Sequence, residues 1–108
     1  MGVEITIHYD KDRVTLKDAT ILSSNAQTII RDVMKKRDVF VHANESTIFI
    51  SDDPIELLIY VNRDKVTDPS QLADGIAQTF GAWRQESAFP HIINLNVMPV
   101  EWHARLGV

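Results

Sequence analysis

A stretch of this chain occurs twice, and the internal repeat constrains the fold more than any other feature of the sequence. The segment Asp-Lys-Asp-Arg-Val-Thr at residues 10–15 returns as Asn-Arg-Asp-Lys-Val-Thr at residues 62–67, a shift of 52 positions. The same shift lays residues 39–44 over residues 91–96. A constant shift at two separate places indicates a duplicated unit. We therefore divide the 108 residues, which are enough for one domain, into pseudo-repeats 1–52 and 53–108.

Each pseudo-repeat predicts a strand, a helix and a closing strand. Apolar residues spaced three and four apart predict one helix that begins at Thr15 and ends near residues 35–37. A second helix is predicted to begin at Asp68, an N-cap residue followed by Pro69 in the first turn. Segments rich in β-branched and other apolar residues predict strands at 3–9, 39–43, 47–50, 55–61 and 91–97.

Two β-α-β units side by side predict an α/β (α+β) protein with a four-stranded mixed sheet and both helices on one face. The other face would then be bare. Ile and Val on both faces of residues 55–61 indicate that it is covered, and a chain this short cannot cover it alone. We therefore expect a homo-oligomer that packs its sheets together. Trp102 and Leu106 near the end of the chain either anchor that interface or fold back over the chain's own sheet.

Composition excludes several classes of function. Acidic residues outnumber basic ones, with a formal net charge of −4, which argues against a nucleic-acid partner. No apolar run approaches the ~20 residues of a membrane span. The chain has no cysteine, its four histidines lack ligand spacing, and its glycines stand singly, so we expect neither a metal nor a cofactor. The beginning of the sequence lacks a secretory signal, so the expected location is cytoplasmic.

The chain resembles the tautomerase superfamily, which includes 4-oxalocrotonate tautomerase and macrophage migration inhibitory factor. Residues 3–7, Val-Glu-Ile-Thr-Ile, look like that family's first strand. Residues 37–50, from Arg-Asp-Val-Phe to Thr-Ile-Phe-Ile, look like a segment of an uncharacterised bacterial branch. The resemblance implies two β-α-β units in each subunit and a homotrimer around stacked sheets.

The resemblance also implies a site at the start of the first strand. The family's catalytic base is an N-terminal proline, whose amine moves a proton between carbon and oxygen, whereas this sequence begins Met1-Gly2. Family members use arginine or lysine to hold a substrate carboxylate, and Arg37 is the best match. The implied catalytic positions are therefore Met1, Gly2 and Arg37. Cations and aromatic residues that could bind a small organic acid are Lys11, Arg13, Lys36, Arg63, Tyr60, Trp102 and His103.

Two interpretations of function follow from this resemblance. The first, which we favour because no positioned base can be named, is a non-catalytic or divergent small-molecule-binding homotrimer without the proline base. The second is a tautomerase or isomerase-like enzyme that acts on a small keto–enol or unsaturated carboxylic acid. A rival fold is the ferredoxin-like arrangement, found in dimeric small-molecule-binding domains and cofactor-free monooxygenases. It has the same order of elements with antiparallel pairing, so the strand order decides between the two folds.

Overall fold

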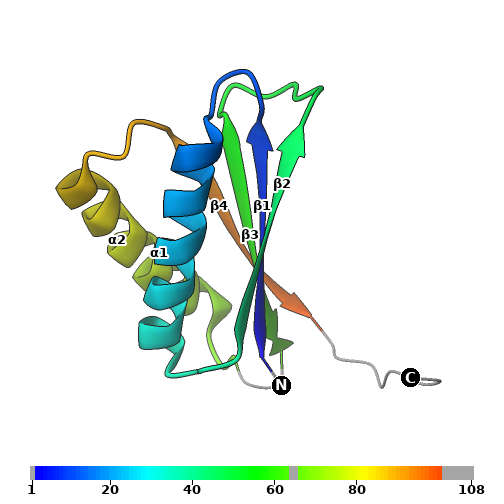
Figure 1. Ribbon diagram of the computed structural model, residues 1–108. Helices are drawn as coiled ribbons and strands as arrows, with labels where there is room; N and C mark the ends of the chain where they lie inside the picture. The colour runs from blue at the N-terminus through cyan, green and yellow to red at the C-terminus, as the bar shows by residue number, and fades with distance from the viewer. Residues whose placement is uncertain (1, 64–65, 101–108) are drawn as a thin grey trace.

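Four strands form one mixed sheet, and both helices pack on the same face of it (Figure 1). The computed structural model describes residues 2–63 and 66–100. The sheet order is β2-β1-β3-β4, with parallel outer pairs and an antiparallel central pair. This pairing confirms the predicted architecture and excludes the ferredoxin-like alternative, in which neighbouring strands are antiparallel. The elements in chain order are β1 (Val3–Asp10), α1 (Leu16–Met34), β2 (Val39–Ser46), β3 (Ile55–Asn62), α2 (Pro69–Ser87) and β4 (Ile93–Val100).

The two halves match in the length of every element. Each half has an eight-residue strand, a 19-residue helix and a second eight-residue strand. The shift between equivalent elements grows along the chain, from 52 residues at the first strand to 53 at the helix and 54 at the closing strand. The constant shift of 52 expected for the closing strand is therefore wrong, because each connection in the second half is one residue longer.

The helices begin and end in the same way in both halves. The N-cap side chains of Thr15 and Asp68 each accept a hydrogen bond from the backbone N–H three residues on, at 3.1 Å in both cases. The C-cap residues Lys35 and Ala88 both adopt the left-handed conformation, with φ of 54° and 55°. These caps satisfy backbone groups that the helix itself leaves without partners, which confirms both predicted helix starts and the end of α1 near Lys35.

Side chains of the central strands alternate strictly between the two faces of the sheet. Along β3, the odd-numbered residues from Ile55 to Val61 are buried beneath the helices, and the even-numbered residues are half-buried on the outward face. The expectation of Ile and Val on both faces is wrong. Period-two geometry places all of them on the buried face and leaves Glu56, Leu58 and Tyr60 outside.

Two predicted strands differ from the structure. Residues 47–50 form no strand, since β2 continues to Ser46, and the Ile48 and Ile50 side chains are exposed. The last strand runs from Ile93 to Val100, so it begins later than predicted and passes through Pro99. A proline is tolerated there because β4 is an edge strand, where an N–H group is not required on the open side. No helix among residues 2–63 and 66–100 is long and apolar enough to cross a membrane.

Candidate functional site

Gly2 lies at the start of β1 in close contact with the segment that leads into β2. The Val3 N–H donates a hydrogen bond to the Asp38 carbonyl at 2.7 Å, which ties the two strand starts together. A Cβ atom placed on Gly2 would lie 2.8 Å from the Asp38 Cβ and closer still to the Asp38 carbonyl oxygen. Position 2 therefore accepts glycine and excludes any side chain unless the backbone of Asp38 moves.

A row of four outward-facing side chains crosses the sheet near this end. The strand register aligns Glu4 with Phe40 on one side and with Tyr60 on the other, and aligns Tyr60 with Met98. Phe40 is 56% exposed and Met98 is 43% exposed. Of this row, only Tyr60 is among the residues predicted from the sequence. The other three could have been found by combining alternation within each strand with the register between strands, which the sequence alone does not give.

Three of the predicted cations lie at the same end of the sheet as Gly2. Lys36 and Arg37 lie between the end of α1 and the start of β2, and Arg63 directly follows β3. The Arg37 side chain is exposed, while its carbonyl accepts hydrogen bonds from the Arg31 Nε at 3.2 Å and from the Val39 N–H at 2.9 Å. The main chain that carries Arg37 is thus held in place, and its guanidinium faces solvent.

The structure does not bring Lys11 and Arg13 to this end. Both follow the last residue of β1, so the length of an eight-residue strand, roughly 25 Å, separates them from Gly2 within one chain. The sequence could not reveal this separation, because it depends on the direction in which β1 runs. Met1, Trp102 and His103 lie outside the described residues.

Arg13 has a defined structural role at the far end of the sheet. Its Nε donates to Asp10 Oδ2 at 2.6 Å, and its two terminal nitrogens donate to the carbonyls of Ser51 and Asp52 at 2.7 and 3.0 Å. One guanidinium thereby joins the end of β1 to the β2–β3 loop. The Arg13 guanidinium and the Asp12 N–H both donate to Asp10 and hold the pKa of that carboxyl below its ordinary value.

No part of the chain that the structure describes gathers three metal-ligating side chains. His8 and His42 lie on the outward face of the sheet, on neighbouring strands. His91 instead contacts Asp18, with 2.9 Å between Nε2 and Oδ2, and this pair was missed because 73 residues separate its members. The described histidines therefore form no group of three ligands with other side chains.

Sequence comparison finds no matching family model and no matching curated protein. Solved structures do match. A fused 4-OT symmetric trimer superimposes with a TM-score of 0.64 at 8% identity, covering 97% of this chain and 94% of the other. A macrophage migration inhibitory factor-like protein from Entamoeba histolytica matches with a TM-score of 0.61 at 12% identity, covering 96% and 94%.

A malonate semialdehyde decarboxylase also matches, with a TM-score of 0.59 at 14% identity, over 96% of this chain and 90% of the other. All three proteins share the tautomerase-type fold, so the predicted resemblance is confirmed at the level of fold. At these identities the likeness establishes the shared architecture alone.

Replacing Gly2 with alanine is expected to destabilise the fold. The added Cβ would meet the Asp38 backbone, and overpacking of this kind costs about 1–3 kcal/mol. The measurement is the free energy of unfolding in urea. Gly81→Ala is the matched control, because a Cβ at Gly81 meets nothing within 4 Å and removes flexibility from α2. Equal stability of Gly2→Ala and the wild type would refute the close packing at position 2.

Replacing Arg13 with leucine is expected to make the free energy of unfolding depend less on pH under acidic conditions. Because the folded-state pKa of Asp10 is depressed, its carboxylate stabilises the fold above the ordinary aspartate pKa of about 3.9. This stabilisation is lost as the pH falls through that value toward the folded-state pKa. Urea unfolding at pH 7 and pH 3 should therefore differ less in Arg13→Leu than in the wild type.

Lys11→Leu provides the control for this experiment, since it removes a neighbouring exposed cation and leaves the Asp10–Arg13 contact in place. An NMR titration of the Asp10 carboxyl gives a direct second measurement. A pKa for Asp10 that is the same in Arg13→Leu and in the wild type would contradict the assigned cause.

Proposed function

We propose that this protein is a homotrimer of the tautomerase-type fold that lacks a proline base and binds a small organic acid without moving a proton. The packing of Gly2 against Asp38 is the observation that carries this proposal. A proline at position 2 would place its Cβ atom against the carbonyl oxygen and the Cβ of Asp38. Moving that backbone would break the hydrogen bond from Val3 N–H to the Asp38 carbonyl, which begins the β1–β2 pairing.

The groups around the start of β1 suit recognition of an acid. Arg37 presents an exposed guanidinium on a main chain fixed by Arg31, and Lys36 lies beside it. A guanidinium binds a carboxylate through paired, charge-assisted hydrogen bonds. Phe40 and Tyr60 on the adjacent outward face offer apolar contact to the rest of a small molecule. These residues supply binding groups, and none of them replaces a positioned amine base.

The outward face of the sheet supports self-association. Neither helix covers this face (Figure 1), and it carries the partly exposed side chains of Phe40, Leu58, Tyr60 and Met98. Apolar side chains on an uncovered sheet gain stability when a second copy removes them from water. One structurally similar protein is described as a symmetric trimer, which favours three copies over two.

The wild-type protein is expected to bind phenylpyruvate and to leave its ketonisation rate at the buffer level. Calorimetry should show binding that weakens by about tenfold or more in Arg37→Ala, because a charge-assisted hydrogen bond is worth about 1.5–3 kcal/mol. Lys17→Ala removes an exposed cation from α1 and should leave binding unchanged. Ketonisation above the buffer rate that disappears in Arg37→Ala would overturn the non-catalytic proposal in favour of an enzyme.

Sedimentation is expected to give three times the 12.3-kDa mass of one chain. Phe40→Glu should dissociate this assembly, since it places a charge on the outward face of β2. Ile21→Glu adds the same charge to an exposed position on α1 and should leave the mass unchanged. A wild-type protein that sediments as a monomer at micromolar concentration would refute the assembly.

A further inference from the structure

The internal repeat gives the molecule two equivalent regions in which the end of one half's helix faces the start of the other half's helix. The helices run in opposite directions on the same face of the sheet (Figure 1). The segment after α2 returns to the start of α1, and the start of α2 lies beside the end of α1. Helix residues of the two halves correspond at a shift of 53 positions. The side chains of the two regions can therefore be compared residue by residue.

Aromatic side chains cluster at the end of α2 and in the segment that follows it. Phe89, the residue after the C-cap of α2, is 6% exposed, and its ring centroid lies 5.1 Å from that of Trp83 and 5.4 Å from that of His91. His91 reaches Asp18 in the first turn of α1. His91 thus joins the segment after α2 to the start of α1, and the Phe89 ring packs against Trp83 and His91.

The equivalent position in the other half carries no ring. Lys36 corresponds to Phe89, because each donates its backbone N–H to the carbonyl of the arginine five residues earlier, at 3.3 Å to Arg31 and 3.1 Å to Arg84. At the same shift, Gly75 stands where the other half has the fully buried Leu22. Gly75 therefore leaves this side without the side chain that Leu22 supplies in the other half, and a pocket of about 420 Å³ lies there.

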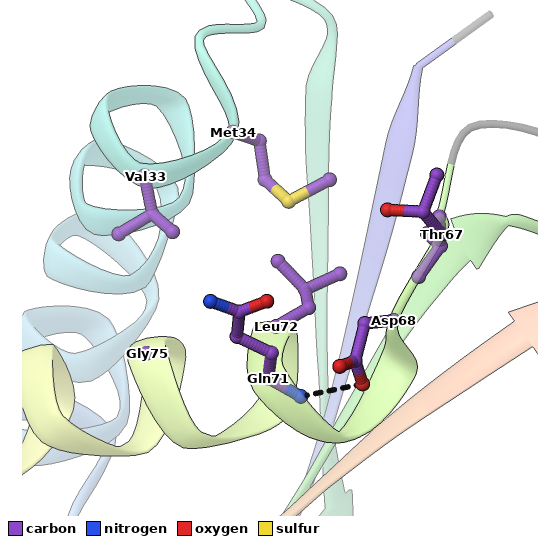
Figure 2. Close-up of a pocket in the computed structure, with 8 residues that line it drawn as sticks. Val33, Met34, Thr67, Asp68, Gln71, Leu72 and Gly75 are labelled. Carbon is purple, nitrogen blue, oxygen red and sulfur yellow. Dashed lines mark hydrogen bonds between the residues drawn. The ribbon is translucent and has the colours of Figure 1, made fainter.

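The pocket has apolar walls and a polar mouth (Figure 2). Val33 and Met34 from α1 and Leu72 from α2 form the apolar part, and a volume of this size lies in the range of sites for small molecules. At the mouth, Asp68 Oδ1 accepts the capping hydrogen bond from the Gln71 N–H at 3.1 Å, which occupies one of its two oxygens. Among the described residues that line the pocket, Asp68 carries the sole formal charge, so the complementary ligand is cationic.

We propose that this pocket binds a small amine with an apolar ring, with the ring among Val33, Met34 and Leu72 and the ammonium group beside Asp68. The inference rests on the pocket and on the comparison of equivalent side chains in the two halves. It is independent of the function proposed for the start of β1. The residues that line the pocket include neither Gly2 nor Arg37, so either proposal can fail without the other.

Phenethylammonium is the probe, and amide chemical shifts of the full chain are the measurement. Saturable shifts are expected around Met34, Gln71 and Leu72. Gly75→Leu restores the side chain that the other half has at Leu22 and should abolish these shifts. Gly81→Leu is the matched control, because neither glycine has an atom within 4 Å of an added Cβ and Gly81 does not line the pocket. Both changes favour helix formation, so the fold is retained.

Charge recognition is tested by replacing Asp68 with asparagine, which caps a helix as well as aspartate does. The affinity for phenethylammonium should fall by about two- to fivefold, the value of an exposed ion pair, while the affinity for 2-phenylethanol stays the same. Phenylacetate should bind more weakly than either compound. The absence of saturable shifts in the wild type at millimolar probe, their persistence in Gly75→Leu, or tighter binding of phenylacetate would each overturn the proposal.

Discussion

Burial of one face of β1 and β3 beneath the two helices is the constraint on which the rest of the structure depends. Complete burial of an aliphatic side chain stabilises a fold by about 1.5–3 kcal/mol, so this layer dominates the choice of register. Once the register is fixed, the alternation of side chains determines which residues face outward. The outward row from Phe40 to Met98 follows from this alternation. The layer consists of Ile5, Ile7, Ile55, Leu57, Ile59 and Val61, all with no exposed surface.

The duplicated halves have kept their framework and changed what lies at the helix ends. Arg31 and Arg84 are equivalent, and each donates its Nε to a carbonyl just before the following strand, at 3.2 Å to Arg37 and 2.8 Å to His91. This contact orients the chain as it leaves a helix and enters the sheet. The side chains next to it have diverged into an aromatic cluster in one half and an open, acid-rimmed pocket in the other.

The sequence predicted what is determined locally. Caps such as Thr15 and Asp68, the helical periodicity and the alternation in residues 3–9 need no knowledge of distant residues, and they agree with the structure. Residues 47–50 have the composition of a strand and form none, because pairing requires a neighbour that composition does not reveal. The sequence does not give the direction of β1, which places Arg13 far from Gly2. It also does not give the packing of the two halves, on which the contact of Asp18 with His91 depends. Of the predicted site residues, the structure brings Gly2 and Arg37 to one end of the sheet, and their role stays a prediction.

The lengthening shift between the halves shows where this architecture tolerates added residues. One extra residue lies between β3 and α2, and another between α2 and β4. An insertion within a strand would turn its aliphatic side chains toward water, so length can change only in the connections. The first addition adjoins the mouth of the open pocket, and the second lies in the segment that carries Phe89 and His91. Diversification of such a duplicated chain is thereby directed to its helix termini, where new chemistry can arise while the sheet beneath stays the same.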